Sequence, residues 1–216
     1  MRLPVTALFL AAGCGLAAPA LAQSAASGPS QGDIVVNLRL TVVAPEGTDP
    51  LTTLAGGATG LRTNVSNDIM PTLGVSYYLT DTLAIEAIAG TTRHTVRAQG
   101  PGTDIKVKKS WVLPPVVTLQ YHFAPGERIR PYVGAGLNYM LFYSGSDRSN
   151  FHFKIKDGFG TALQAGVDIA ANDRWSINLD AKKVFFDTTA TDRVSGLRSK
   201  VTLDPWVVSG GLGYRF

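Results

Sequence analysis

The chain ends in GLGYRF (residues 211–216), the last part of a segment that alternates every second residue from Trp206 onward. One face of this segment is apolar with aromatic residues at both ends, and the other is mostly small or polar. The apolar face consists of Trp206, Val208, Gly210, Leu212, Tyr214 and Phe216. A period of two residues with an aromatic at each end is typical of a strand that crosses a bilayer in a closed barrel. The segment therefore predicts an outer-membrane β-barrel.

The N-terminus predicts a secretory signal peptide. Arg2 precedes an apolar run over residues 5–16, which is shorter than the roughly 20 residues that a spanning helix needs. The sequence ALA at 20–22 then supplies a small-x-small cleavage site. We expect residues 1–22 to be removed and residues 23–216 to form a single transmembrane β-barrel domain.

Cysteine content and charge narrow the class of protein further. Cys14 is the only cysteine and lies in the signal peptide, so the mature chain would form no disulfide. A lipoprotein acylated at Cys14 is a less favoured alternative, because Ala11 stands where such sites usually carry leucine. Loss of Arg2 leaves 19 of the 20 basic side chains against 16 acidic ones. This mild balance gives no indication of nucleic-acid binding.

Seven further segments alternate with the same period, which predicts eight antiparallel strands. They span residues 34–43, 70–79, 83–92, 111–123, 131–143, 159–169 and 175–185. The connectors alternate between short turns (80–82, 124–130, 171–174) and long polar stretches (44–67, 93–110, 144–158, 187–200). Short periplasmic turns and long extracellular loops give this asymmetry, so we expect both termini on the periplasmic side of the outer membrane. Pro114 and Pro115 lie near the start of the fourth strand, where a bulge or strand end tolerates a missing donor.

The face opposite the aromatic residues carries charges, which argues against a soluble barrel. A lipocalin-like barrel, the main alternative on pattern alone, would carry its apolar face inside. Arginine facing lipid at mid-depth would cost about 2–4 kcal/mol. We therefore predict that the charged residues line the lumen and pair there as a structural network, since buried charges need partners. They are Arg39, Glu86, Asp168, Asp180, Lys182 and Arg215.

Inward-facing apolar residues near the outer rim are candidates for a ligand site. A barrel of eight strands is just wide enough for side chains to fill it, so no open aqueous pore is expected. These residues would either form an apolar funnel for a slender ligand or plug the lumen, and the pattern leaves both open. They are Val116, Met140, Phe142, Phe186, Leu203 and Val207.

Other residues predict contacts with the membrane. Two aromatic girdles are expected at the bilayer interfaces, formed by Trp111, Tyr139, Tyr143, Trp175, Trp206 and Tyr214. Phe216 is a predicted C-terminal assembly signal for the barrel assembly machinery. The connector 93–110 is rich in Arg and Lys. It would either bind the phosphates of lipopolysaccharide or form an ordinary solvated loop.

Several stretches resemble the outer membrane protein W (OmpW) family. They are LPPVVTLQYHF (113–123), RPYVGAGLNY (130–139), GVDI (166–169), DTTA (187–190) and LDPWVVSGGLGYRF (203–216). The resemblance implies an eight-stranded barrel with a narrow, largely apolar lumen that admits small hydrophobic compounds and releases them sideways into the membrane. It also implies roles in stress responses and as a phage or bacteriocin receptor. Asp180 and Lys182 are charged residues on the lumen face, so they do not fit a wholly apolar passage.

We therefore expect a narrow channel or binding site for uptake of small hydrophobic molecules, including detergents, across the outer membrane. The alternative is a non-conducting structural, adhesion or receptor barrel with a plugged lumen. An enzyme is not expected, because none of His94, His122 and His152 begins the His-x-Ser pattern of lipid A deacylases. Histidines without paired carboxylates are a weak metal signal, so we predict no metal and no cofactor. The ligand and the oligomeric state stay open.

Overall fold

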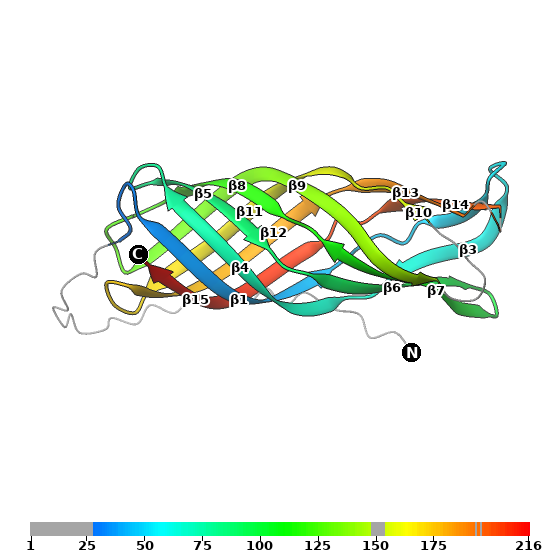
Figure 1. The fold of residues 1–216 in the computed structure, drawn as a ribbon, viewed down its shortest axis with the longest axis horizontal. Coiled ribbons are helices and arrows are strands. Elements are labelled where there is room, and N and C mark those ends of the chain that lie inside the picture. The colour runs from blue at the N-terminus through cyan, green and yellow to red at the C-terminus, as the bar shows by residue number, and fades with distance from the viewer. Residues whose placement is uncertain (1–27, 148–153, 193, 195) are drawn as a thin grey trace, which may run out of the picture.

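The computed structural model describes residues 28–147, 154–192, 194 and 196–216. The predicted signal peptide with its cleavage site and His152 lie outside these residues. The described chain is all-β, with 15 strands in one antiparallel sheet that closes on itself (Figure 1). Within the described residues, no helix has the length and hydropathy to cross a membrane.

Eight of the strands close a barrel, which confirms the predicted fold. Neighbours follow the order β9-β11-β12-β15-β1-β4-β5-β8, and β8 pairs back to β9. The bounds are β1 Ile34–Ala44, β4 Asp68–Tyr78, β5 Leu83–Ala89, β8 Val116–His122, β9 Ile129–Asp147, β11 Gly158–Ala170, β12 Trp175–Phe185 and β15 Trp206–Arg215. First and last strands meet, because β1 pairs with β15 and the Phe216 N–H donates to the Ile34 carbonyl over 2.9 Å.

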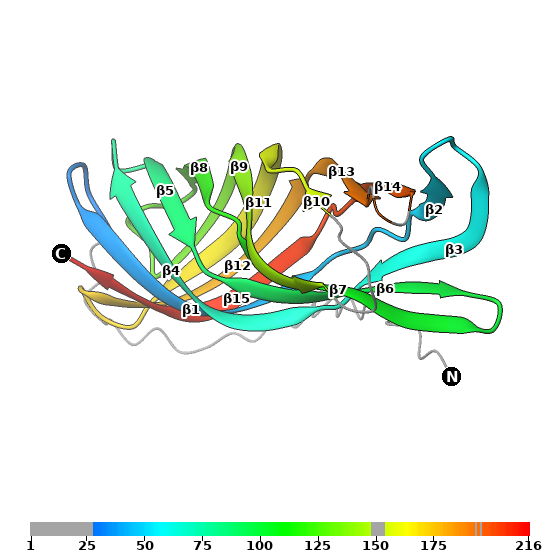
Figure 2. The same cartoon turned by 45° about the vertical axis from the view of Figure 1, so that its right-hand side comes forward.

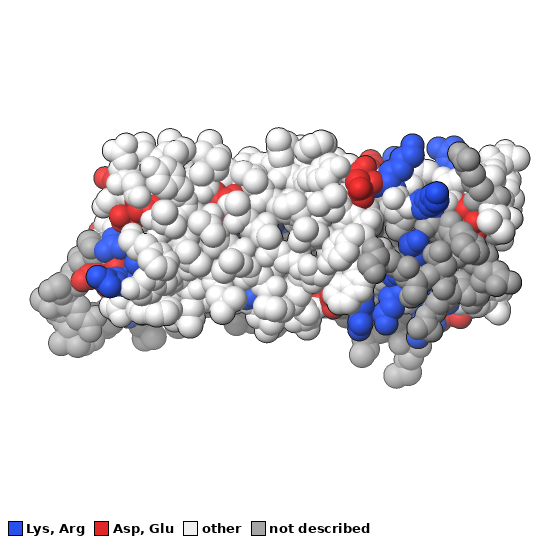
Figure 3. Space-filling view, in the orientation of Figure 1, with Lys and Arg blue, Asp and Glu red and all other residues white. Residues whose placement is uncertain are grey.

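Exposure alternates along these strands as the sequence pattern predicts. In β8, Thr118 and Gln120 are buried, whereas Val117 and Leu119 are about half exposed. The exposed residues face outward, and on the face seen in Figure 3 they form a broad, almost uncharged belt over the middle of the barrel, with a large group of Lys and Arg beyond it on the right and a smaller charged group on the left. An apolar outer belt is suited to contact with lipid, and a polar interior is suited to a lumen that lipid does not enter.

The other strands extend the wall beyond the barrel at the end with the long connectors, which we call the upper end (right in Figures 1 and 2). They are β2 Pro50–Thr53, β3 Ala58–Val65, β6 Thr92–Gly100, β7 Thr103–Leu113, β10 Lys154–Ile155, β13 Asp187–Asp192 and β14 Leu197–Thr202. Together with the last part of β9 they form the upper sheet, in the order β10-β13-β14-β2-β3-β6-β7-β9.

The long connectors, expected as polar loops, thus carry much of the wall of the molecule. Their inward residues Leu51, Ala98, Val107 and Ala190 form a buried apolar cluster of their own. Burying these side chains is favourable and holds the strands together above the barrel.

Two predicted strands are each divided in the structure. The segment 83–92 ends as β5 at Ala89 and resumes as β6 at Thr92, and the segment 111–123 is interrupted by Pro114 and Pro115. Proline has no N–H to give to a neighbouring strand, which explains the interruption of the second segment.

Candidate functional site

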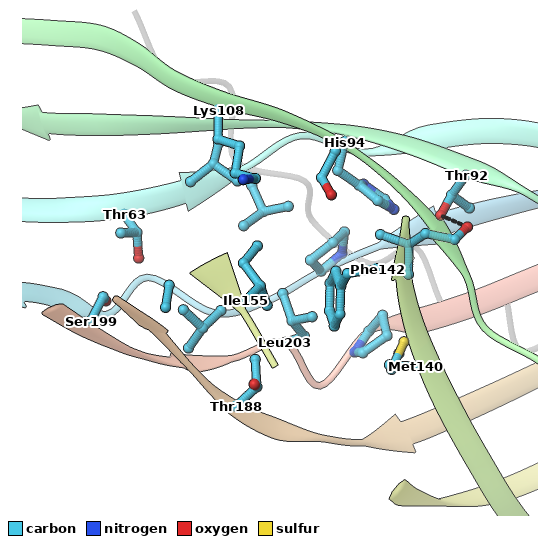
Figure 4. Close-up of a pocket in the computed structure, with 18 of the residues that line it drawn as sticks. Thr63, Thr92, His94, Lys108, Met140, Phe142, Ile155, Thr188, Ser199 and Leu203 are labelled. Atoms are coloured by element: carbon cyan, nitrogen blue, oxygen red, sulfur yellow. Dashed lines mark hydrogen bonds between the residues drawn. The ribbon is translucent and has the colours of Figure 1, made fainter. Parts of the chain in front are cut away.

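An apolar cavity lies inside the upper sheet, where it meets the barrel (Figure 4). We call it the upper cavity. The cavity has a volume of about 70 Å³. Most of its lining is apolar and comes from both parts of the molecule, including Val43, Leu51, Val96, Val107, Val112, Met140, Phe142, Ile155 and Leu203. Its size and lining suit a slender apolar molecule better than a hydrated ion.

The structure brings the predicted apolar lumen residues together at the junction of barrel and upper sheet. Val116, Met140 and Phe186 belong to one buried cluster, and Phe142, Leu203 and Val207 pack against it, partly buried. Met140, Phe142 and Leu203 line the upper cavity. The Phe142 and Phe186 rings have their centroids 6.2 Å apart.

A second, smaller cavity continues below the first, inside the top of the barrel. It shares Val43, Met140 and other residues with the upper cavity and has a volume of about 40 Å³. Val116 and Val207 line it, and Lys182 marks its lower side. We call it the lower cavity. Because the two cavities share lining residues, they are neighbours along the barrel axis.

The lower cavity reaches the barrel wall at a break between two strand pairs. Ala89, Gly90 and Pro114 are among its lining residues, and Ala89 is exposed on the outer face. Pairing of β5 with β8 stops at Ile88↔Val116, and pairing of β6 with β7 starts at Thr92↔Val112. Residues 89–91 therefore lie opposite residues 113–115 in an unbroken register, but no backbone pairing joins them. We call this break the wall gap.

Below the lower cavity, charged side chains fill the lumen. Glu86 accepts from Arg39 Nη2 over 2.5 Å and lies 3.2 Å from Lys182 Nζ, which also donates to Asp180 over 2.6 Å. The side chains of these four residues are at most 1% exposed. Gln164 Nε2 donates to Glu86 over 3.0 Å and to Asp180, and the Tyr132 hydroxyl donates to Asp180 over 2.7 Å. Two cations and two carboxylates thus neutralise one another inside the barrel, which offsets the cost of burying them.

The remaining predicted lumen charges lie closer to the periplasmic end. Asp168 accepts from Asn178 Nδ2 over 2.8 Å, and Asn178 in turn accepts from Arg39 Nε over 2.6 Å, so Asp168 belongs to the same network. Arg215 lies at the periplasmic mouth, where it donates to the Gly28 carbonyl and is 3.6 Å from Asp33. The network occupies the axial path below the lower cavity.

Aromatic residues lie on the outer surface near both ends of the barrel strands. At the periplasmic end, the Tyr214 ring contacts Trp175 at 4.9 Å and Phe216 at 4.8 Å between centroids. At the upper end, Arg93 lies over Trp111 and Lys183 over Trp206. Tyr139 contacts Phe159 there, and the Tyr143 hydroxyl donates to Thr91 over 3.1 Å. These places suit the predicted girdles, since aromatic rings favour the two interfaces of a bilayer.

His94 lines the upper cavity but was not predicted as a site residue from the sequence. It projects from β6 into the lining of the upper cavity and is 8% exposed. Burial lowers the pKa of His94 below its usual value, although a hydrogen bond to Ser66 and the charge of Asp68 act the other way. The alternation of Thr92, His94, Val96 and Ala98 was the signal that could have placed it on an inward face.

Metal-ligating side chains form no cluster in the described part of the chain, at its histidines or elsewhere. No group of three or more His, Cys, Asp or Glu side chains there could hold a metal ion. His94 lines the upper cavity, whereas His122 lies near the periplasmic end, where its Nδ1 is 3.9 Å from Asp168.

Comparison with known proteins gives the relatives of this chain. The sequence model of the OmpW family matches residues 30–216. An uncharacterized outer-membrane protein, y4mB of Sinorhizobium fredii, is 36% identical over 94% of this chain and 91% of its own length. Outer membrane protein W of Escherichia coli is 34% identical over 75% of this chain and 81% of its own length.

Two further proteins, both from Pseudomonas aeruginosa, are similar to this chain. The dibenzothiophene metabolism operon protein PahQ of Pseudomonas aeruginosa is 30% identical over 73% of this chain and 76% of its own length. The crystal structure of the outer membrane protein OprG from Pseudomonas aeruginosa superposes with a TM-score of 0.82 at 27% identity, over 88% of this chain and 98% of that one.

Proposed function

This chain belongs to the OmpW family of integral outer-membrane β-barrels, and we propose that it carries small hydrophobic molecules across the outer membrane. The observation that carries the proposal is an apolar cavity at the upper end that is closed below by buried ion pairs. The name of PahQ, which places that relative in an operon for metabolism of an apolar aromatic compound, supports the same class of cargo.

The charge network favours sideways release over release along the barrel axis. An apolar molecule that moved straight down would have to separate Arg39, Glu86 and Lys182, whose side chains are at most 1% exposed. Separating a buried pair costs about 3–5 kcal/mol, with no polar group on the cargo to compensate. The wall gap offers an exit without that cost. Residues 89–91 and 113–115 share no backbone pairing that would have to break.

The proposed route therefore has three parts. The molecule enters the upper cavity from outside, passes Met140 into the lower cavity, and leaves through the wall gap into the hydrocarbon of the membrane. Apolar surface stays covered along this route, first by side chains and then by lipid, which removes the penalty of crossing water.

Substitution of the residue shared by both cavities tests the route. Met140→Arg would place a long cation where the two cavities meet, so we expect uptake of a radiolabelled apolar compound by intact cells to fall to the level of cells without the protein. Met140→Leu keeps volume and hydropathy and should retain uptake. Ile105→Arg adds the same charge at an exposed position outside the cavities and serves as the matched control.

Folding of each variant is checked by the shift in gel mobility of the barrel on heating. A folded Met140→Arg variant with wild-type uptake would contradict the route. Loss of uptake in Ile105→Arg as well would show that added charge alone, not the cavity, is responsible.

A structural, adhesion or receptor barrel is the second candidate, and the closed lower lumen favours it equally. The same uptake assay separates the two, because such a barrel would give no uptake above that of cells without it. Lipopolysaccharide at the basic upper surface and the assembly machinery at Phe216 are proposed partners in either case.

A further inference from the structure

The outer face of strands β6 and β7 carries three cations close together. Strand pairing sets Arg97 directly opposite Lys106, and Lys109 lies three residues further along β7. Residues beside them in the sequence line the upper cavity, namely Val96, Ala98, Val107, Lys108 and Ser110. Successive residues of a strand point to opposite faces, so Arg97, Lys106 and Lys109 point outward. We call these three residues the outer cations.

Charge on this face is not balanced. Asp104 is the only acidic residue in the segment 92–113. It accepts a 2.7 Å hydrogen bond from Arg97 Nε, and this bond, with the charges of Arg97 and Lys106, lowers the pKa of Asp104. One carboxylate thus stands against three cations. Like charges directly opposite each other on paired strands are destabilising, so an anion between Arg97 and Lys106 would be favourable.

The outer cations have hydrogen-bond donors to give to such an anion. Arg97 uses Nε for Asp104. No residue in the described part of the chain accepts from the terminal nitrogens of Arg97 or from the ammonium groups of Lys106 and Lys109. Phosphate oxygens accept charge-assisted hydrogen bonds of this kind, and a guanidinium group can bind two of them at once.

Their height on the molecule suits the headgroups of a membrane lipid. Trp111, on the same strand, is 38% exposed at the predicted upper girdle, and Arg93 lies over its ring. Aromatic residues of a girdle lie at the level of the headgroups. Lys109 is two residues further from the barrel than Trp111, or about 7 Å along the strand. Figure 3 shows Lys and Arg gathered at this end, beyond the uncharged belt.

We propose that the outer cations form a docking surface for lipopolysaccharide and bind the phosphates of its headgroup. These phosphates lie in and just above the headgroup layer of the outer leaflet, at the level of the outer cations. The inference rests on the partner proposed above and names the residues and the chemical group that make the contact. The surface lies on the outer wall, so a docked lipid leaves both apolar cavities open.

Two forms of one lipid isolate the phosphates. Rough lipopolysaccharide, which has no O-antigen chain, is compared with the same molecule after its phosphates are removed. Binding of each to the refolded mature barrel in detergent micelles is titrated by native mass spectrometry, which counts the lipid molecules that stay bound. We expect the phosphorylated form to bind at least about fivefold more tightly, because three exposed charge pairs add their modest contributions. Added ammonium acetate should reduce this ratio by screening.

Two variants assign the preference to the outer cations. The triple variant Arg97→Gln, Lys106→Gln and Lys109→Gln should bind both forms of the lipid equally. The double variant Lys106→Arg and Lys109→Arg keeps the charges and should keep the preference. The shift in gel mobility on heating checks that each variant is folded.

A matched control removes the same charge elsewhere on the upper end. Lys154→Gln, Lys156→Gln and Lys200→Gln replace three exposed lysines on β10, just after it and on β14. This variant should keep the preference for the phosphorylated form. An equal loss in the control would show that net charge alone attracts the lipid, and would overturn the docking surface.

Three other results would also overturn it. They are equal binding of the two forms by the wild-type protein, a preference that survives in the folded triple variant, and displacement of the lipid by inorganic phosphate at the same concentration. The last result would assign the outer cations to the free ion. Uptake of apolar molecules would stand in each case, because the outer cations do not line either cavity.

Discussion

Arg39 and Glu86 stand 47 residues apart in the chain and form a 2.5 Å ion pair in the barrel lumen. The pair reaches from β1 to β5 across the intervening strand β4, at the position of Gly74. A Cβ at Gly74 would lie 2.8 Å from Arg39 Nη1 and 3.2 Å from Glu86 Oε1. The glycine therefore leaves the space in which the two side chains meet.

Glu86 holds the network together, because it pairs with Arg39 and Lys182 at once. Glu86→Ala would leave Arg39 without its carboxylate and Lys182 with Asp180 alone. Removing one partner of a buried pair costs about 3–5 kcal/mol, so the free energy of unfolding in urea should fall by that amount. The exposed pair of Lys200 with Asp187 is the control, and Lys200→Ala should cost less than about 1 kcal/mol. Equal unfolding midpoints for the two variants would show that the buried network contributes no more than a surface pair.

Gly166 is required by the ring of Tyr132. A Cβ at this position would lie 2.4 Å from the Tyr132 Cζ and hydroxyl and 2.7 Å from the Leu179 carbonyl oxygen. Gly166→Ala should displace the ring, break its hydrogen bond to Asp180 and lower the free energy of unfolding by about 1–3 kcal/mol. Gly126→Ala, where the added methyl group meets open space, is the matched control in the same urea titration. A Gly166→Ala variant as stable as Gly126→Ala would contradict this packing.

The barrel could be predicted from the sequence because lipid outside and polar groups inside impose a period of two residues. The same reasoning placed Arg39, Glu86 and Lys182 on the inner face, since an arginine in lipid is costly. That they pair was predicted, but which residue pairs with which was not, because partners such as Arg39 and Glu86 come from strands whose relative stagger depends on how the barrel closes.

The strands of the upper sheet could not be predicted from the sequence for a different reason. Its strands are short or rich in polar residues on both faces, as in β14, so their alternation is weak. Arg215 shows a related limit: it has the register of a lumen residue but lies at the mouth, where the barrel ends. The wall gap depends on two prolines whose effect on pairing is visible only once the neighbouring strand is known.

The central claim is that apolar molecules leave sideways through the wall gap. A disulfide across the gap that can be formed and then reduced, which we call the staple, tests this most directly. Thr91 and Leu113 stand opposite each other in the register that continues from Thr92↔Val112 to Ile88↔Val116. Because the only cysteine of the chain lies in the predicted signal peptide, Thr91→Cys with Leu113→Cys introduces a single new pair.

The measurement is uptake of a radiolabelled apolar compound by cells that produce this double variant, before and after reduction of the disulfide. Sideways release predicts uptake at the level of cells without the protein while the staple is oxidised, and recovery toward wild-type uptake once it is reduced. Equal uptake in the oxidised and reduced states, above that of cells without the protein, would contradict release through the wall gap.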